Sequence, residues 1–126
     1  MSNDAIRWSK RPATEDYTAA LDYLSLIFAT PQAKRLVGRL RNSRPIKRAA
    51  KDLLRASTLP VLPSEDAAVA KELKKIQKAK ALSPILLVQG DSSRGAALII
   101  ADGYHRICAA YHEDESSEVV CLMAGR

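Results

Sequence analysis

The residues of this chain best suited to chemistry lie in one turn, where Asp102, Gly103, His105 and Arg106 stand within five positions. The apolar residues before this turn predict a buried strand, and residues 104–111 predict a helix. A helix that begins at a glycine turn points unpaired backbone N–H groups outward, and its dipole adds about half a positive charge there. The turn therefore predicts an anion-binding site, in which the N–H groups after Gly103 are joined by the side chains of His105 and Arg106.

Two residues of the turn admit more than one role. As the residue beside the helix start, Asp102 would cap the first N–H groups, which is the favoured interpretation. Alternatively, its carboxylate would bind Mg²⁺, since Mg²⁺ is commonly held by one or two carboxylates together with phosphate oxygens. Tyr104 contributes its backbone N–H to the anion site, while its side chain is expected to pack or to form a hydrogen bond. If the site supports a reaction, Asp102 and His105 are the catalytic candidates.

Hydrophobic periodicity predicts the elements that position this turn. Helices are expected at 14–29, 31–42, 45–56, 65–79 and 104–112, and strands at 85–88, 97–101 and 119–123. The first helix is expected to bury Tyr17, Leu21, Leu24, Ile27 and Phe28. Pro60 and Pro63 predict an extended segment at a sheet edge. Together these elements predict an α/β or α+β fold: a flexible lead at 1–13, a three-helix region at 14–57 and a second domain with a small sheet at 58–126.

The positive charge of the chain is concentrated in one segment. Of the formal net charge of +6, residues 31–57 carry +8, from nine Lys and Arg residues against Asp52 alone, and the remainder carries −2. In the helix expected at 45–56, the basic residues would share one face. These residues are Arg44, Lys47, Arg48, Lys51 and Arg55. Such a face predicts either sequence-independent contact with nucleic-acid phosphates or a merely solvated surface.

Composition limits the class of protein further. The chain has 126 residues and two cysteines, Cys108 and Cys121, so we expect two buried free thiols in a reducing cytoplasm instead of a disulfide framework. No apolar run approaches the length of a membrane span, and the first residues do not resemble a secretory signal. The segment 112–115 is rich in His and acidic residues, but adjacent positions give no defined coordination geometry, and no metal site is expected there.

The turn and its surroundings resemble the ParB/sulfiredoxin superfamily. The resemblance rests on the sequence Ala-Asp-Gly-Tyr-His-Arg-Ile-Cys-Ala-Ala at 101–110 and on the order of the elements expected from residue 58 to residue 124. In these families the turn binds nucleotide phosphates. Sulfiredoxins use ATP to repair an over-oxidised cysteine, ParB proteins bind and hydrolyse CTP while clamping DNA, and related kinases phosphorylate free serine. The resemblance implies a bacterial-type cytoplasmic protein with a nucleotide-binding domain.

Individual residues of the turn limit which of these activities the resemblance implies. Gly103, His105 and Arg106 match the Gly-Cys-His-Arg signature of sulfiredoxins, but Tyr104 stands where those enzymes have their cysteine nucleophile. Sulfiredoxin activity is therefore not expected. ParB proteins carry Glu-Arg-Arg in this turn, so CTP specificity is not implied either. The Asp-Gly-x-His-Arg form is more similar to the kinase-like branches. It implies a protein that binds a nucleotide or another phosphorylated small molecule, with ATP and Mg²⁺ as candidate cofactors, or alternatively a small-molecule phosphotransferase.

The helix expected at 65–79 carries four lysines on one face. They are Lys71, Lys74, Lys75 and Lys78, at helical spacings of three, four and seven residues. Such a face is usually solvated surface. In sulfiredoxins the equivalent helix faces the nucleotide phosphates, and the resemblance therefore makes Lys71 and Lys75 candidate phosphate contacts.

Overall fold

The fold is organised around a four-stranded mixed sheet with the strand order β1-β4-β2-β3, in a computed structural model that describes residues 6–126. The strands are β1 (Ile46–Ala49), β2 (Ile85–Val88), β3 (Ile99–Asp102) and β4 (Glu118–Ala124). The helices are α1 (Thr14–Leu24), α2 (Thr30–Arg41), α3 (Ala50–Ser57), α4 (Ala67–Gln77) and α5 (Tyr104–Glu113), with a short 3-10 helix η1 (Ser92–Arg94). This architecture confirms the expected α+β class.

Strand β2 lies inside the sheet, and its apolar sequence accounts for that position. It runs parallel to β4, with Ile85 opposite Cys121, and antiparallel to β3 on its other side. All four of its residues are buried. A strand that is covered on both faces reads as a continuous apolar run instead of an alternating one. The prediction of a strand at 85–88 is confirmed.

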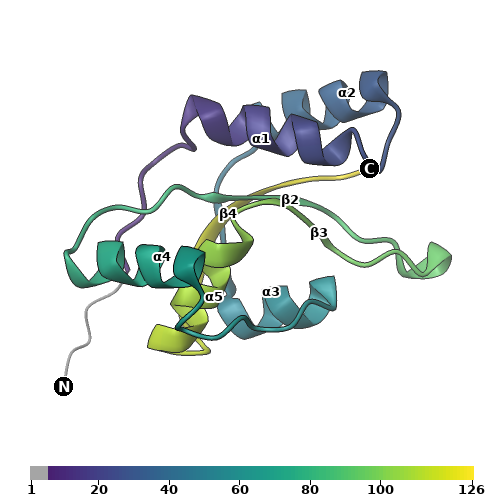
Figure 1. The fold of residues 1–126 in the computed structure, drawn as a ribbon. Coiled ribbons are helices and arrows are strands. Elements are labelled where there is room, and N and C mark those ends of the chain that lie inside the picture. The colour runs from purple at the N-terminus through teal and green to yellow at the C-terminus, as the bar shows by residue number, and fades with distance from the viewer. Residues whose placement is uncertain (1–5) are drawn as a thin grey trace.

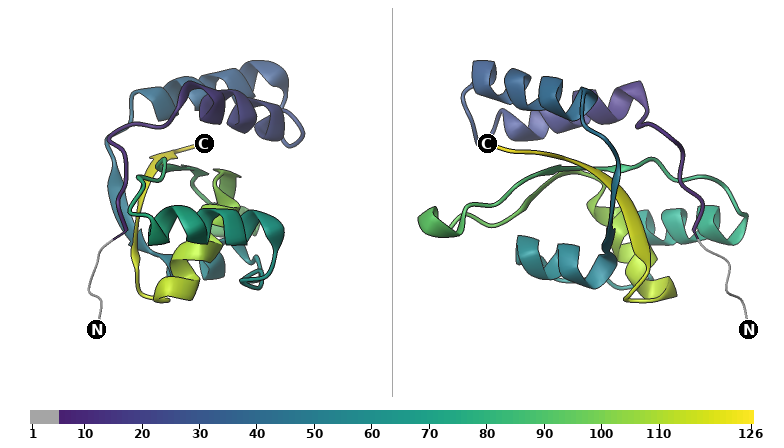
Figure 2. Two further views of the ribbon diagram at one scale, coloured as in Figure 1. Left: turned by 60° about the vertical axis from the view of Figure 1, so that its left-hand side comes forward. Right: turned by 180° about the vertical axis from the view of Figure 1, so that it is seen from behind.

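Helices cover both faces of the sheet and form three layers (Figures 1 and 2). Side chains alternate along each strand, so each strand contributes to two separate cores. Ile85 and Leu87 pack toward α3, α4 and α5, whereas Leu86 and Val88 pack toward α1 and α2. The sheet therefore holds α1 and α5 on opposite faces, and only its rim can bring them together.

The segment 46–49 corrects the helix expected at 45–56. It forms the edge strand β1, antiparallel to β4, and α3 begins only at Ala50. The apolar spacing in this segment suits a helix, but pairing with the open edge of β4 satisfies the backbone groups of four residues. The first N–H groups of α3 are then bound by carbonyls of the 115–117 loop, from Ala50 to Ser117 and from Lys51 to Glu115, each at 2.9 Å.

Two smaller expectations are also wrong. Helix α1 ends at Leu24, where the Ser25 hydroxyl bonds back to the Leu21 carbonyl at 2.8 Å, and Ile27 beyond it is 48% exposed instead of buried. The segment 58–63 was expected to extend along a sheet edge, but it is an irregular connection, and the two edges of the sheet are formed by β1 and β3.

Helix α5 fastens this connection at two points. The Tyr104 hydroxyl donates to the Pro60 carbonyl, and His112 Nε2 lies 2.7 Å from the Leu62 carbonyl. Cys108 lies between these contacts on α5, and both cysteines are buried and free, as expected. Among the residues that the structure describes, no helix combines the length and the apolar character needed to cross a bilayer.

Candidate functional site

A polar cleft of about 300 Å³ opens at the carboxyl end of β3, where the two helical layers meet at the rim of the sheet. Its walls come from α1, α4, the connection before β2, the end of β3 and the start of α5. The lining residues are Asp16, Glu72, Lys75, Ala81, Ser83, Asp102, Gly103, His105 and Arg106. The volume lies at the lower end of the range for small-molecule sites.

The bend at Gly103 shapes the floor of this cleft. Gly103 has φ = 108°, a left-handed conformation that L side chains rarely adopt, and a Cβ there would overlap the Ile85 side chain. No side chain caps α5, and its first helical hydrogen bond runs from Ile107 N–H to the Gly103 carbonyl at 3.1 Å. The N–H groups of Tyr104, His105 and Arg106 therefore have no acceptor within the helix.

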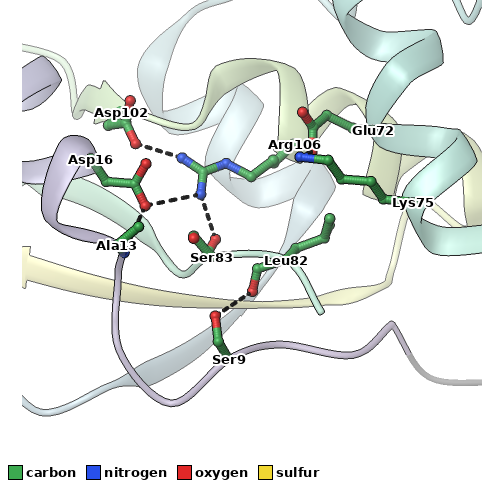
Figure 3. A network of polar contacts seen from close by, with 9 residues as sticks. All are labelled: Ser9, Ala13, Asp16, Glu72, Lys75, Leu82, Ser83, Asp102 and Arg106. Atoms are coloured by element: carbon green, nitrogen blue, oxygen red, sulfur yellow. Dashed lines mark hydrogen bonds and ion pairs between the residues drawn. The ribbon is translucent and has the colours of Figure 1, made fainter. Parts of the chain in front are cut away.

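The guanidinium of Arg106 is held by internal partners (Figure 3). Nη2 donates to the Asp102 carboxylate at 2.5 Å, and Nη1 donates to the Ser83 carbonyl at 2.7 Å and lies 3.7 Å from Asp16. The side chain is only 12% exposed. Arg106 is thus not a free cation. It joins the end of β3, the start of β2 and α1 across the rim of the sheet.

This network decides the role of Asp102. The expected N-cap interaction is absent, because the carboxylate turns to Arg106 and away from the helix N–H groups. Burial raises the pKa of Asp102, and the negative charge of Asp16 adds to this effect, while Arg106 opposes it. Asp16 and Asp102 share the single guanidinium of Arg106, so these three side chains together carry a net negative charge.

A second ion pair forms the opposite wall. Lys75 Nζ lies 3.5 Å from Glu72 Oε1 on α4, and the two side chains stand beside the stem of Arg106 in Figure 3. Glu72 Oε1 is buried and has no hydrogen-bond donor among the described residues. Lys75 is the more exposed of the two, at 42% against 15%. The wall therefore presents the Lys75 ammonium at its surface, paired with a carboxylate oxygen of Glu72 that is buried beneath it.

The structure brings together most of the residues predicted for the anion site. Asp102, Gly103, His105, Arg106 and Lys75 line one cleft, with His105 exposed at its edge. The Tyr104 side chain points to the 58–63 connection, as expected for a packing residue. Lys71 is exposed on α4 and lies outside the cleft.

The residues predicted for nucleic-acid contact do not share a helix face. Arg44 precedes β1, Lys47 and Arg48 lie on that strand, and Lys51 and Arg55 lie on α3. Because neighbouring residues of a strand point to opposite sides, Lys47 and Arg48 cannot act together as one helical face would. The prediction of a single basic helix is wrong, although all five residues are exposed.

Sequence reasoning missed two carboxylates of the cleft, Asp16 and Glu72. Asp16 lies in the first turn of α1, where an acidic residue is common at a helix start, and it accepts from the Ala13 N–H at 3.0 Å. Glu72 stands among lysines on α4, where an acidic residue reads as surface. Neither position carries a local signal, because both reach the cleft only through packing of α1 and α4 at the rim of the sheet.

The charged side chains that line the cleft give it a net negative charge. Three carboxylates face one guanidinium and one ammonium, which leaves a formal charge of −1 before His105 is counted. No cluster of three or more metal-binding side chains occurs within residues 6–126.

Comparison with known proteins gave no matching family model, no matching curated protein and no matching solved structure.

Proposed function

We propose that the cleft binds a small phosphorylated ligand, with a nucleotide as the leading class. The observation that carries the proposal is the uncapped start of α5, whose free N–H groups follow the Gly103 bend into the same cleft as Lys75 and His105. Helix starts of this kind bind phosphate groups through backbone N–H groups and the helix dipole. The resemblance of residues 101–110 to the phosphate-binding turn of the ParB/sulfiredoxin superfamily supports the same function.

The charges of the cleft place a condition on this ligand. A phosphate group adds negative charge beside Asp16, Glu72 and Asp102, which Arg106 and Lys75 do not fully neutralise. Binding as a Mg²⁺ complex resolves this, since Mg²⁺ needs only one or two protein carboxylates when phosphate supplies other ligands. Glu72 and Asp102 are the carboxylates of the cleft wall that would hold the ion. Bound Mg²⁺ would supply charge neutralisation at the phosphate.

The residues of the chain then have separate tasks. The N–H groups of Tyr104 and His105 hold the phosphate oxygens, and Lys75 covers them from α4. Arg106 acts as a positioning residue, since its guanidinium fixes the bend through Asp102 and Ser83. Glu72 accepts a hydrogen bond from a hydroxyl group of the ligand, such as that of a ribose.

Ligand binding is tested by isothermal titration calorimetry with ATP, ADP, CTP and ribose 5-phosphate, each with and without Mg²⁺. We expect saturable binding of at least one of them, strengthened by Mg²⁺. Lys75→Ala should weaken it about tenfold, as the loss of one charge-assisted contact does. Lys74→Ala, an exposed neighbour on the same helix, is the matched control. Equal behaviour of the two variants, or no binding by any phosphate compound, contradicts the proposal.

A second candidate function is phosphoryl transfer to a small hydroxyl compound, which the carboxylate of Glu72 in the wall of the cleft favours. A carboxylate in that position can accept the proton of a hydroxyl group as it attacks a phosphorus atom. The test is ATP consumption in the presence of small hydroxy acids and serine. We expect Glu72→Gln to abolish turnover while binding of ATP persists. If the unmodified protein binds ATP but does not consume it, phosphoryl transfer is contradicted and only the binding function stands.

A further inference from the structure

The outer face of α2 carries a second group of basic residues, separate from the cleft. Ala33, Leu36, Val37 and Leu40 face the sheet, and the opposite side of the helix carries basic residues and no acidic one. The exposed basic residues of α2 are Lys34, Arg35, Arg39 and Arg41. Four of the nine basic residues of 31–57 thus lie on this one helix, whereas the five predicted from sequence are divided among the approach to β1, β1 itself and α3.

Within residues 6–126 these charges have no carboxylate partner, although Arg39 donates to the Gly125 carbonyl and Arg41 lies over the Tyr17 ring. Of the nine basic residues in 31–57, only Arg55 forms an ion pair within the described part of the chain. Lys34 and Arg35 make no hydrogen bond or ion pair there, and both lie in the first half of α2, where the helix dipole does not favour cations. Neither pairing nor helix capping accounts for these two residues, so their charge is available to a partner.

A glycine stands at the centre of this face. Counting 3.6 residues per turn, Lys34 and Arg41 lie on one side of Gly38 around the helix, and Arg35 lies on the other. A Cβ at Gly38 would meet nothing within 4 Å, so packing does not require a glycine. Glycine inside a helix costs about 1 kcal/mol relative to alanine. What the missing side chain provides is close access of an external backbone to the helix between the cations.

Further arginines extend the face at the carboxyl end of α2. Arg11 donates to the carbonyls of Arg41, at 2.5 Å, and Ser43, at 3.1 Å, which brings its guanidinium to this end. Arg44 follows directly and is exposed. From Lys34 to Arg41 the helix rises about 10 Å, which is about three phosphates of one duplex strand measured along its axis.

We propose that the outer face of α2 binds the phosphate backbone of a nucleic-acid duplex. The abundance of arginine favours phosphodiester groups, since the guanidinium matches phosphate oxygens in a bidentate way. An anionic membrane is the competing occupant, since Tyr23, Leu26 and Ile27 are exposed just before α2, but α2 itself exposes no large apolar side chain between its cations. The contacts expected are to the backbone alone, so binding should not depend on base sequence.

The test is fluorescence anisotropy with a short labelled DNA duplex and an RNA duplex of the same sequence, using the full chain. We expect binding whose logarithm falls linearly with the logarithm of salt concentration between about 50 and 200 mM. Lys34→Glu/Arg35→Glu should lower the affinity at least about tenfold and reduce the salt slope by about 2, one unit for each lost phosphate contact. Lys74→Glu/Lys78→Glu changes the net charge equally on exposed positions of α4 and should lower the affinity less than about twofold.

A second variant separates close approach from charge. Gly38→Leu leaves the net charge unchanged, and the open space above Gly38 lets the fold accept it. We expect it to weaken duplex binding about threefold or more, with an unchanged circular dichroism spectrum. Equal losses in the two charge-reversal variants would overturn the proposal, as would failure of both duplexes to bind at low salt. Binding to phosphatidylserine vesicles in the absence of duplex binding would overturn it in favour of a membrane.

Discussion

The cleft at the end of β3 and the outer face of α2 use positive charge in opposite ways. In the cleft, Arg106 is 12% exposed and is shared by Asp16 and Asp102, so its charge is consumed inside the protein. On α2, Lys34 and Arg35 are exposed and have no carboxylate partner in the described chain. The first arrangement fixes a geometry, whereas the second produces a field that reaches into solvent.

The difference separates two kinds of anion recognition. A cleft with paired charges recognises a ligand by shape, through backbone N–H groups and one exposed lysine. A helix face with unpaired charges recognises a polyanion by long-range attraction that salt weakens. Salt should therefore affect the two proposed binding activities unequally, even though we propose phosphate-containing ligands for both.

The largest expected effect is that of Arg106→Ala on stability. The substitution leaves Asp102 and Asp16 without their cation in a largely buried place and removes the bond to the Ser83 carbonyl. We expect a loss of about 3 kcal/mol in the free energy of unfolding, measured by urea denaturation. Arg55→Ala is the control, since the Arg55–Asp52 pair is exposed and should contribute less than about 0.5 kcal/mol. Similar losses in both variants would show that Arg106 is not buried among its partners.

The next effect concerns the bend. Gly103→Ala forces a side chain into a left-handed conformation and against Ile85, so we expect a loss of about 2 to 3 kcal/mol by the same measurement. Gly95 has φ = 67° but open space around it. Gly95→Ala therefore reports the backbone strain alone, which is about 1 kcal/mol. If the two variants lose the same amount, the contact with Ile85 has no part in shaping the cleft.

Much of this cleft could be predicted because its signals are local. The apolar run of β2 and the glycine turn before α5 specify a buried strand and a strand-to-helix bend within a few residues each. Lys75 was predicted as a phosphate contact from the resemblance, together with Lys71, and only Lys75 lines the cleft. What could not be predicted is that Arg106 turns inward, because its partner Asp16 arrives from α1 through tertiary packing.

The basic face could be predicted in charge but not in shape. Residues 46–49 follow a helical apolar pattern, and only the open edge of β4 makes them a strand. This pairing divides the expected basic helix and leaves α2 as the longest continuous basic surface of that segment. Local spacing does not report the availability of a strand edge more than sixty residues away, at Glu118–Ala124.

A smaller effect follows from the raised pKa of Asp102. Burial raises this pKa above 3.8, so the folded state holds its proton at pH values where the unfolded chain has lost it. The contribution of this group to stability is therefore full below pH 3.8 and is lost as the pH rises through the raised pKa. We expect the stability of the unmodified protein to fall relative to that of Asp102→Asn over this window. Urea denaturation of both proteins between about pH 3 and pH 7 measures the difference, and a difference that grows in the other direction contradicts burial as the dominant cause.

The smallest effect has the opposite sign and belongs to α2. Gly38→Ala places a methyl group in open space within a helix, so we expect stability to rise by about 0.5 to 1 kcal/mol, measured by urea denaturation. The methyl group also stands between Lys34 and Arg41, where we place the duplex backbone, and it should lower duplex affinity slightly. A more stable protein that binds the duplex less tightly supports close approach at Gly38, whereas unchanged affinity would show that a methyl group there does not obstruct the duplex. An increase in both stability and affinity would mean that a rigid helix, and not close approach at Gly38, governs binding to this face.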